Sequence, residues 1–297
     1  MVKIRNALGL FDGISCGQVA LQRAGVTYET YYASEIDTYP ISVTQRNFPD
    51  TVQLGDVTKW KDWDLKDIDL IMGGSPCQGF SMAGKRLNFD DPRSKLFFDF
   101  VAIVKHYKPK YFLLENVMMK KEIRDAISAE LGVEPILINS GLVSAQSRDR
   151  LYWTNIPDVE LPKDRGIYLK DIILTSLPAA EIRGGDLEEY FASKVGILSP
   201  RGLCHIGTAK INGIESLKRV YHPNGKSPTL TTSMGGNRES KVSISETRWR
   251  KLTPLECERL QTLPDDYTKG LSNTQRYKAL GNGWTVDIIA HIFENIR

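Results

Sequence analysis

Cys77 lies in a sequence setting that favours a reactive thiol over a structural one. It follows an apolar run at residues 69–72 and the turn GGSP at residues 73–76. The two glycines let the backbone approach a ligand, and Pro76 fixes the φ angle just before the thiol. A lone cysteine is more commonly a small buried hydrophobe, but that role needs no such turn. Because an ordinary thiol is only slightly ionised at neutral pH, a nucleophilic Cys77 also needs nearby positive charge or hydrogen bonds.

Glu115 and two arginines are candidate partners of this thiol. Glu115 stands near the end of the apolar run YFLLENV, where a partly desolvated carboxyl group can carry or share a proton. Gln146, Arg148 and Arg150 occupy alternate positions, so in a strand all three point to one face. Two guanidinium groups there can stabilise an anion, position a carbonyl oxygen or hold phosphate. The alternative is an edge strand with a charged outer face.

Three turns that follow apolar runs carry residues suited to an adenosine-containing ligand. The first, FDGISCG at residues 11–17, lacks the dinucleotide pattern G-x-G-x-x-G because Ser15 takes the place of the second glycine. Glu35 ends the second run, where a carboxylate can accept hydrogen bonds from a ribose diol. Asp56 can accept a bond from an adenine amino group while Val57 packs on the ring. Taken singly, such acids are more often helix caps or loop residues, but their placement at successive strand ends favours the ligand.

Strand-like runs alternate with helical patterns over the first 140 residues. The alternation predicts a doubly wound α/β domain with a mostly parallel sheet, in which ligands bind beyond the carboxyl ends of the strands. Two further runs, 133–141 and 149–155, predict an antiparallel hairpin at the sheet edge. The other predicted strands are 6–11, 30–34, 68–74 and 110–116, and the predicted helices are 17–25, 40–48, 94–107 and 120–131.

The regular pattern dissolves beyond about residue 160. Gly, Pro, Ser and Thr dominate there, with short strand-like stretches such as residues 227–233. Helical patterns return at residues 253–264 and 284–296. We therefore expect two domains. Residues 1–160 and 250–297 form a catalytic domain, and residues 161–249 form a small, irregular, β-rich domain inserted into it.

Composition argues against several classes of protein. The 297 residues, 41% of them hydrophobic, can bury the core of one large or two unequal domains. No run of about 18 apolar residues predicts a membrane helix and the first residues lack a signal-peptide pattern, so we expect a cytoplasmic protein. The four cysteines and four histidines are scattered without a CxxC pair, so we expect neither a disulfide framework nor a metal site.

The net charge of +3 is unevenly distributed. Residues 199–241 hold seven Lys and Arg against two acids, a charge of +5, which leaves −2 for the rest of the chain. Clustered cations suit a polyanion such as nucleic acid, because phosphate contacts reward nearby positive charge. The alternative is a solvated loop region.

Together these segments resemble the cytosine-C5 DNA methyltransferases, in order as well as in content, from near the first residue to the last. DLIMGGSPCQGFS is similar to the family's Pro-Cys nucleophile loop, ENV to its glutamate motif and QSRDR to its Q-x-R-x-R motif. RKLTPLECERLQTLPDDY resembles the helical segment after the recognition region, and ALGNGWTV resembles the closing motif that returns to the cofactor. The Pro-Cys loop and the Q-x-R-x-R motif are highly specific in combination.

The resemblance implies a methyltransferase fold that binds S-adenosylmethionine and releases S-adenosylhomocysteine. The implied reaction methylates C5 of a cytosine in a specific short sequence of duplex DNA. Cys77 would attack C6 of the cytosine, which must first flip out of the duplex. Glu115 would bind the ring N3 and the exocyclic amine, Arg150 would hold the base O2, and Arg148 would support the loop.

The resemblance also implies binding residues, with two departures from the commonest bacterial pattern. Asp12 and Ser15 stand where many members have Ala and Gly, and Gly283-Trp284 replaces the usual Ser and aliphatic residue. Both features resemble a subset that includes the animal de novo enzymes. The expected cofactor-binding residues are Phe11, Asp12, Gly13, Ile14, Gly17, Glu35, Ile36, Asp56, Val57, Gly74, Pro76, Leu96, Asn282, Gly283 and Trp284. Within and around a target-recognition domain at 161–249, the expected DNA-binding residues are Gln78, Ser81, Arg201, Lys218, Arg219, Thr229 and Arg238.

The implied partner is double-stranded DNA in a bacterial or phage-infected cell, where the enzyme associates with the nucleoid. A cognate restriction endonuclease in the same host is a candidate partner, and we expect a monomer that binds no membrane and no metal. Three alternatives remain: a transfer-RNA cytosine methyltransferase, a catalytically inactive DNA-binding relative and a nicotinamide oxidoreductase. The complete set Cys77, Glu115, Arg148 and Arg150 disfavours the inactive relative, and the missing glycine pattern disfavours the oxidoreductase.

Overall fold

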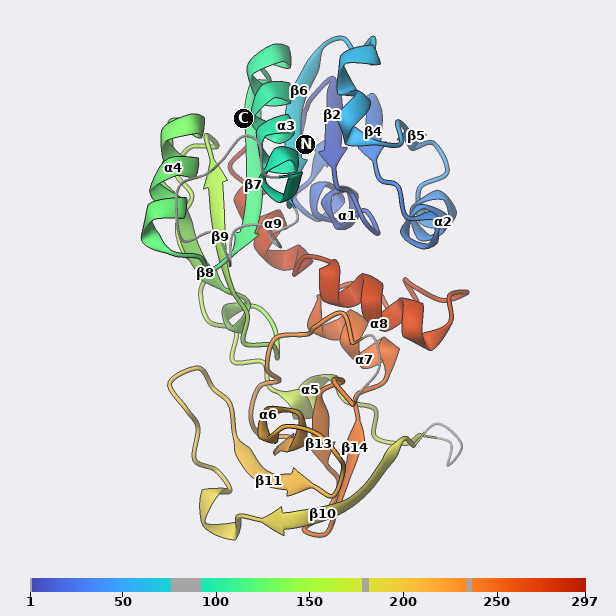
Figure 1. Ribbon diagram of the computed structural model, residues 1–297, viewed down its shortest axis with the longest axis vertical. Coiled ribbons are helices and arrows are strands. Elements are labelled where there is room, and N and C mark those ends of the chain that lie inside the picture. Colours follow the sequence, from blue (N-terminus) through green and yellow to red (C-terminus); the bar gives the residue numbers. More distant parts are fainter. Residues whose placement is uncertain (1, 76–91, 178–181, 234–236) are drawn as a thin grey trace. The chain divides into compact units, whose positions relative to one another are not determined.

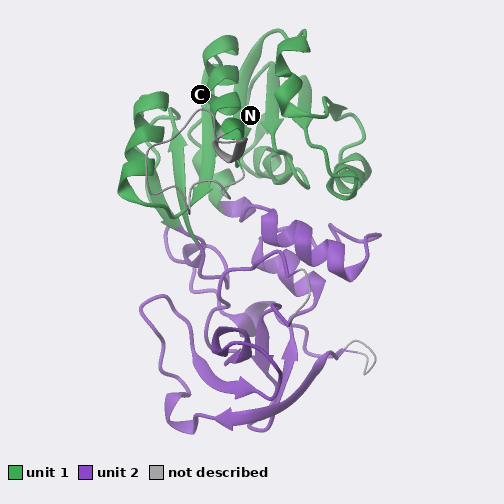
Figure 2. Cartoon of the chain, in the orientation of Figure 1, with its two compact units in different colours: residues 1–138, 149–161, 288–297 green, residues 139–148, 162–287 purple. Residues whose placement is uncertain are grey.

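The described chain folds into two compact units (Figure 2). A computed structural model of the protein describes residues 2–75, 92–177, 182–233 and 237–297. Unit 1 comprises residues 1–138, 149–161 and 288–297, and unit 2 comprises residues 139–148 and 162–287. Helices of the 253–282 region therefore group with unit 2. The division into catalytic and target-recognition domains at residues 160 and 250 is a functional one and stays a prediction.

Unit 1 is built on a seven-stranded sheet (Figure 1). Five neighbouring strands run parallel, and β9 runs antiparallel to β7. This arrangement confirms the predicted doubly wound, mostly parallel sheet. The strand order is β5 (Val52–Gln53), β4 (Thr30–Ser34), β2 (Asn6–Leu10), β6 (Ile68–Gly73), β7 (Tyr111–Val117), β9 (Asp149–Thr154) and β8 (Ile136–Asn139).

Helices connect the strands of unit 1, and local signals fix where they begin and end. Asp37 caps α2 by accepting a hydrogen bond from the Tyr39 N–H at 3.1 Å. Gly132 ends α4 with a φ of 73°, a left-handed conformation that glycine adopts without strain. The connecting elements are α1 (Cys16–Arg23), α2 (Thr38–Asn47), η1 (Val57–Asp62), α3 (Pro92–Tyr107) and α4 (Lys121–Leu131), and β1 (Val2–Lys3) pairs with β3 (Val26–Thr27).

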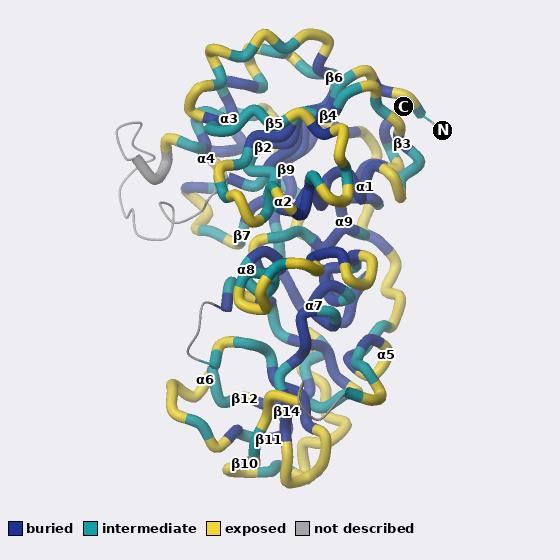
Figure 3. The backbone as a smooth tube through the Cα atoms, turned by 90° about the vertical axis from the view of Figure 1, so that its right-hand side faces the viewer, coloured by how far each residue is buried: buried dark blue, intermediate teal, exposed yellow. Residues whose placement is uncertain are grey.

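The core of unit 1 explains why its strands are apolar along their whole length. Helices cover both faces of a doubly wound sheet, so both faces of a central strand are buried. Leu8 and Leu10 of β2, Ile71 of β6 and Trp153 of β9 are at most 1% exposed and belong to one cluster. In Figure 3 these strands appear as the buried centre of the unit. This packing fixes the strand ends, where the candidate site lies.

Unit 2 contains a closed five-stranded barrel. Its small core gathers Cys204, Ile206, Val220 and Trp249, none of them more than 3% exposed. The strands are β10 (Gly184–Tyr190), β11 (His205–Ala209), β12 (Arg219–Tyr221), β13 (Lys241–Ser243) and β14 (Arg248–Lys251). The helical elements are η2 (Ser140–Leu142), α5 (Leu169–Ile172), η4 (Ala192–Lys194), α6 (Glu215–Lys218), α7 (Pro254–Leu260) and α8 (Asn273–Asn282), while α9 (Val286–Phe293) runs from unit 2 into unit 1.

One predicted element of unit 2 is wrong. Residues 227–233 form no strand, although Ser227 makes an isolated bridge to Gln146. The segment lies along the Q-x-R-x-R stretch instead. The Ser227 N–H donates to the Ala145 carbonyl at 2.7 Å, and the Ser227 carbonyl accepts from the Ser147 N–H at 2.8 Å. A segment with extended backbone has strand-like composition even when its partner is an irregular segment, and this is why the sequence predicts a strand at residues 227–233.

Candidate active site

The turn after β2 adopts a backbone that few residues favour. Phe11, Gly13 and Ser15 all have left-handed φ angles, of 54°, 59° and 57°. Such angles are uncommon outside glycine and persist only where neighbouring structure holds them. The Gly13 N–H donates to Glu35 Oε2 at 2.9 Å, which ties this turn to the end of β4. Ile14 is 1% exposed and anchors the turn in the core.

Glu35 is held in place by three backbone donors. Its Oε1 atom accepts from the N–H groups of Ile36 and Asp37 at 2.8 and 2.9 Å, and its Oε2 atom accepts from Gly13. The carboxylate is thereby fixed beyond the carboxyl end of β4, where a ligand of a parallel sheet is expected. The neighbouring Ile36 is 73% exposed, which is unusual for isoleucine and leaves an apolar surface at the same strand end.

Asp56 is a helix cap, which was the alternative for a single acid in this turn. Its Oδ1 atom accepts from the Thr58 N–H at 2.9 Å, and this backbone hydrogen bond is the main cause that lowers the Asp56 pKa. Val57 is 5% exposed and packs in the core of unit 1.

Leu96 lies half-buried on α3 and packs against that core. Gly17 lies in α1, where a Cβ atom would collide with Met72.

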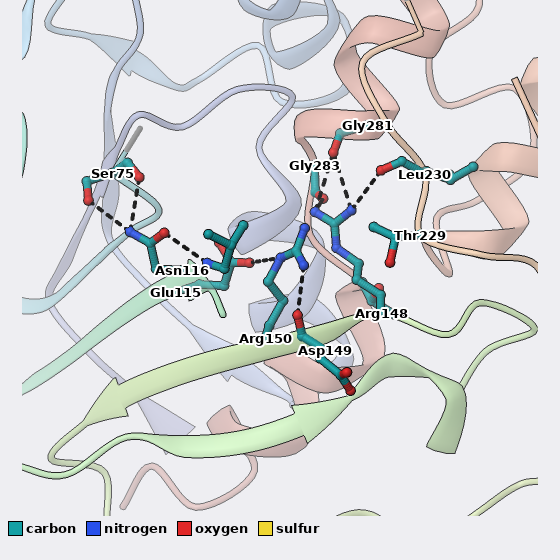
Figure 4. Close-up of polar contacts among 12 residues, drawn as sticks. Ser75, Glu115, Asn116, Arg148, Asp149, Arg150, Thr229, Leu230, Gly281 and Gly283 are labelled. Carbon is teal, nitrogen blue, oxygen red and sulfur yellow. Dashed lines mark hydrogen bonds and ion pairs between the residues drawn. The ribbon is translucent and has the colours of Figure 1, made fainter. Parts of the chain in front are cut away.

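The described part of the Pro-Cys turn is tied to the next strand. The Asn116 side-chain amide donates to the Ser75 carbonyl at 3.2 Å and to Ser75 Oγ at 3.3 Å (Figure 4). Gly73 serves packing, because a Cβ atom there would lie 2.8 Å from the Leu10 carbonyl oxygen. Gly74 is partly exposed at the end of β6. Pro76, Cys77, Gln78 and Ser81 lie outside the described residues.

Glu115 and Arg150 form an ion pair across neighbouring strands (Figure 4). Arg150 Nε lies 2.8 Å from Glu115 Oε1, with the side chains 13% and 10% exposed. The pair forms because β7 and β9 are antiparallel, with Val117 opposite Arg150 and Glu115 opposite Tyr152. Arg150 also donates from Nη1 to the Asp149 carbonyl at 2.7 Å. The carboxylate and the guanidinium are thus oriented at the same sheet edge as the turn that leads to Cys77.

Arg148 has entirely different partners, although it is only two residues away. It is 3% exposed and its guanidinium donates to the carbonyls of Leu230 at 3.3 Å, Gly281 at 3.4 Å and Gly283 at 3.1 Å. The edge-strand alternative is wrong, because β9 lies between β7 and β8 and begins only at Asp149. The alternating spacing therefore does not predict a shared anion site. Arg148 holds two backbone segments of unit 2, one at Leu230 and one at residues 281–283.

Two polar side chains complete this arrangement in unit 2. Gln146 accepts the Leu230 N–H at 2.8 Å and donates to Gln261 Oε1 at 3.1 Å. Thr229 donates its hydroxyl to the Ser147 carbonyl at 2.9 Å. Both groups bind backbone or buried side chains, so they position the segments that meet at Arg148.

The expected residues of the closing motif lie at the end of α8. Asn282 is exposed, while Gly283 and Trp284 are half-buried. Gly283 accepts from Arg148 and from the Gln261 amide at 3.0 Å. Gly281 must be glycine, since a Cβ atom there would collide with the Thr231 backbone.

The basic segment presents less charge to solvent than its composition predicts. Lys226 and Lys241 are 6% and 3% exposed, and both ammonium groups donate to backbone carbonyls. Burial lowers the pKa of each. Lys218 pairs with Glu188 at 3.1 Å and Arg219 with Glu215 at 3.2 Å. Arg201, Lys210 and Arg238 are exposed.

Sequence reasoning missed Asn116 and Tyr31, and it counted Lys226 as a cation of the basic segment although its side chain is buried. Asn116 is part of the motif ENV, so its position beside Glu115 was the available signal. Tyr31 lies inside an apolar strand, and no local pattern marks its hydroxyl as a partner of Asp12.

Within the described ranges, no helix is long and apolar enough to cross a membrane, and no three His, Cys, Asp or Glu side chains are grouped as metal ligands.

The mostly parallel seven-stranded sheet of unit 1, with acids at successive strand ends, defines the class of doubly wound α/β proteins. Two solved structures share the fold. A DNMT2 variant of Spodoptera frugiperda has a TM-score of 0.69 at 21% identity and aligns over 98% of this chain and 99% of its own. The methyltransferase EhMeth of Entamoeba histolytica has a TM-score of 0.70 at 16% identity and aligns over 98% and 97%.

Sequence comparison places the chain within one family of this class. Residues 6–128 and 142–297 match the family described as C-5 cytosine-specific DNA methylase. The chain is 30% identical to the type II methyltransferase M1.ScrFI of Lactococcus lactis subsp. cremoris, over 97% of this chain and 77% of that protein. It is 27% identical to the type II methyltransferase M.HhaI of Haemophilus parahaemolyticus, over 97% and 93%. The chain belongs to the C-5 cytosine-specific DNA methylase family.

Proposed function

We propose that the chain transfers a methyl group from S-adenosylmethionine to C5 of a flipped-out cytosine in duplex DNA, through a covalent bond between Cys77 and C6. The observation that carries this proposal is the Glu115–Arg150 pair at the carboxyl end of β7. β6, which leads into the Cys77 turn, pairs with β7, and Asn116 holds Ser75 two residues before the thiol. A nucleophile and a base-recognising pair at one sheet edge fit a single substrate.

The Glu115–Arg150 pair offers a pattern that matches cytosine. The carboxylate can accept hydrogen bonds from the exocyclic amine and from a protonated N3, and the guanidinium can donate to O2. Thymine carries O4 in place of the amine, so it would set an acceptor against the carboxylate. Two acceptor oxygens that face each other in a partly buried site lose hydrogen bonds to water without gaining one to each other. Thymine therefore binds more weakly, and the pair favours cytosine.

The chemistry assigned to the chain's own residues is a covalent addition and its reversal. The Cys77 thiolate forms a bond to C6 while Glu115 shares a proton with N3, which moves electron density to C5. S-adenosylmethionine, when bound, supplies the electrophilic methyl group. After transfer a base removes the C5 proton, the bond between sulfur and C6 breaks, and the thiolate and the aromatic ring are restored. Arg148 positions the segment that carries Arg150.

The strand ends of unit 1 fit an adenosine-containing cofactor. Glu35 is fixed by three backbone donors, so its remaining acceptor capacity can serve a ribose diol. Ile36 offers an exposed apolar side chain for the face of a ring. The turn at residues 11–15 lies at the topological position where doubly wound sheets bind ligands. We assign the cofactor to this set of unit 1, and the role of the closing-motif residues stays a prediction from the sequence.

The DNA surface is assigned to residues 161–249 and to the loop that carries Gln78 and Ser81. Exposed Arg201 and Arg238 are the best candidates for phosphate contacts, since exposed cations bind phosphate and buried ones do not. We expect a monomeric enzyme of a bacterial or phage-infected cytoplasm, with a cognate restriction endonuclease as a candidate partner.

The test is transfer of labelled methyl from S-adenosylmethionine to unmethylated duplex DNA, followed by bisulfite sequencing. We expect methylation at one short recurring sequence. Cys77→Ala should abolish transfer and keep cofactor binding, while Cys204→Ala, which removes a sulfur from the barrel core, should keep transfer. Incorporation into RNA instead of DNA would keep the chemistry and overturn the substrate. No incorporation into either would overturn the proposed function.

A further inference from the structure

Asp12 lies within the turn after β2, and its carboxylate contacts the Tyr31 hydroxyl. Its Oδ1 atom accepts a hydrogen bond from the Tyr31 hydroxyl at 2.6 Å, and Tyr31 is only 2% exposed. The Oδ2 atom has essentially no solvent-accessible surface and no hydrogen-bond partner among the described residues. A buried carboxylate oxygen without a partner is costly, so an ionised Asp12 calls for a compensating positive charge.

The surrounding chain keeps space open for this acid. A Cβ atom at Gly9 would collide with Asp12 Oδ1 and the Tyr31 hydroxyl, and a Cβ atom at Gly17 would collide with Met72 and lie 3.1 Å from the same hydroxyl. Two glycines therefore leave room for one carboxyl group and its tyrosine partner. Space reserved in this way indicates that the acid belongs to the architecture of the turn.

A buried polar network supports Asp12 from the side of α1. The Gln18 amide donates to Ser15 Oγ at 2.8 Å and to Thr51 Oγ1 at 2.9 Å, and the Tyr28 hydroxyl donates to Gln18 Oε1 at 2.7 Å. The Ser15 hydroxyl in turn favours the charged form of the neighbouring Asp12. The network fixes the turn whose Phe11, Gly13 and Ser15 have left-handed φ angles.

The carboxyl group of Asp12 gains or loses its proton near neutral pH. Burial raises the pKa of Asp12 to about 7, the hydroxyl groups of Tyr31 and Ser15 oppose the rise, and the charge of Glu35 adds to it. The tyrosines facing it do not titrate near neutral pH, because burial raises the pKa of Tyr28 to about 12 and that of Tyr31 well above its usual range. Asp12 is thus the group of this network whose charge a ligand can change.

We propose that Asp12 is a specificity-determining residue that favours the cationic donor S-adenosylmethionine over its by-product S-adenosylhomocysteine. The inference rests on the proposed function, which places the cofactor against the turn at residues 11–15. The two molecules differ by one positive charge, on the sulfonium sulfur of the donor. A carboxylate in a water-poor setting attracts that charge more strongly than it would in bulk water. After transfer the charge is lost, so the ionised Asp12 favours exchange of product for donor.

Because cofactor binding and ionisation of Asp12 are coupled, the number of protons released on binding can be measured. A bound cation stabilises the ionised carboxylate, so binding of the donor lowers the pKa of Asp12 and releases protons near pH 7, and binding of the neutral product releases fewer. If the donor lowers this pKa by about one unit, its affinity relative to the product rises by about tenfold as Asp12 ionises.

The experiment is isothermal titration calorimetry of the full-length protein with each cofactor, without DNA, between pH 6 and 8. Titrations in buffers of different ionisation enthalpy give the number of protons exchanged. We expect wild-type protein to release up to about half a proton per donor at pH 7, and its donor-to-product affinity ratio to rise with pH. Asp12→Asn should exchange none of these protons, and its affinity ratio should be lower and flat with pH.

A second variant keeps the test decisive if Asp12→Asn fails to fold. Tyr31→Phe removes the hydrogen bond that favours ionisation, so the proton release should move to higher pH. Tyr107→Phe is the matched control, because its hydroxyl donates to the Trp63 carbonyl at 3.1 Å and takes no part in this network, so it should leave the profile near wild type. Equal proton exchange with both cofactors, or an affinity ratio that Asp12→Asn leaves unchanged, would overturn the inference. Failure to bind either cofactor would instead overturn the proposed function.

Discussion

Two arginine–glutamate ion pairs, one in each unit, differ in how completely they are shielded from solvent. In unit 2, Arg250 and Glu256 form two hydrogen bonds of 2.8 and 2.7 Å, with side chains 5% and 0% exposed. In unit 1, Arg150 approaches Glu115 through Nε at 2.8 Å, with side chains 13% and 10% exposed. The first pair is sealed in the protein, and the second keeps contact with solvent at the end of a strand.

The difference shows what separates a structural ion pair from one that can meet a substrate. Glu256 also accepts the N–H groups of Thr253 and Leu174, both at 2.7 Å, so four donors use its two oxygens. It joins the start of α7 to β14 and to the segment after α5, and it has no capacity for a ligand. Glu115 lies where the parallel strands end, which is where ligands of such sheets bind. The pair type alone therefore does not identify a site.

The largest effect is expected at Glu115. Glu115→Gln removes the group that shares a proton with the base but keeps its size, so methyl transfer should fall by about 10²- to 10⁴-fold. The melting temperature should change little, because glutamine keeps an oxygen that can accept from Arg150 Nε. Single-turnover methyl transfer and thermal unfolding measure the two quantities. Glu122→Gln, an exposed acid at the start of α4, is the control and should leave both unchanged. Near-normal transfer by Glu115→Gln would remove its assigned role.

At Glu256 we expect a large loss of stability while cofactor binding is kept. Glu256→Ala leaves the buried guanidinium of Arg250 without its carboxylate partner and should lower the free energy of unfolding by about 3–5 kcal/mol. Denaturant unfolding measures the loss, with the exposed Glu246→Ala in the barrel as control. Cofactor binding by the folded fraction should persist. A variant as stable as wild type would show that the sealed pair does not hold unit 2 together.

A smaller, pH-dependent effect is expected at Lys241. Burial lowers the pKa of this group to about 8 from the ordinary 10.5, so the unfolded chain binds more protons than the folded one. The contribution of Lys241 to stability therefore rises as pH increases from about 8 to about 10.5. Lys241→Met should lack this rise when melting temperatures are compared across that range, and the exposed Lys210→Met should keep it. Parallel profiles for wild type and Lys241→Met would contradict the assignment.

The smallest effect is expected from single exposed cations of the basic segment. Arg238→Ala should weaken DNA binding several-fold and reduce the slope of log affinity against log salt by about one. Lys218→Ala should change the slope less, because Lys218 already pairs with Glu188. Fluorescence anisotropy with duplex DNA at several salt concentrations measures both. Affinity that does not respond to salt would argue against a phosphate-binding surface in residues 199–241.

Much of the fold and the identity of the site could be predicted from the sequence. Alternating apolar runs predict the parallel sheet because helices bury both faces of its strands, and turns after those runs predict where ligands bind. The motif ENV lies at a strand end, and Arg150 lies on the neighbouring strand. These features depend on local pattern and on topology, which the order of residues carries directly.

What could not be predicted depends on long-range contacts. The alternation of Arg148 and Arg150 gives no sign that one binds backbone carbonyls and the other a carboxylate, because those partners lie far along the chain. The burial of Lys226 and Lys241 is invisible to a charge count for the same reason. Residues 227–233 have strand-like composition, but their partner is an irregular segment.

The most direct test of the central claim is to trap the bond between Cys77 and the base. In duplex DNA that carries 5-fluorocytosine at the target position, fluorine replaces the C5 proton whose loss completes the reaction. Incubation with S-adenosylmethionine should then give a covalent protein–DNA complex that survives denaturing electrophoresis, with the modified peptide at Cys77 by mass spectrometry. Cys77→Ala should give none, and Cys204→Ala should react as wild type does. Methyl transfer to ordinary DNA without any trapped complex, or a complex at another residue, would contradict the mechanism.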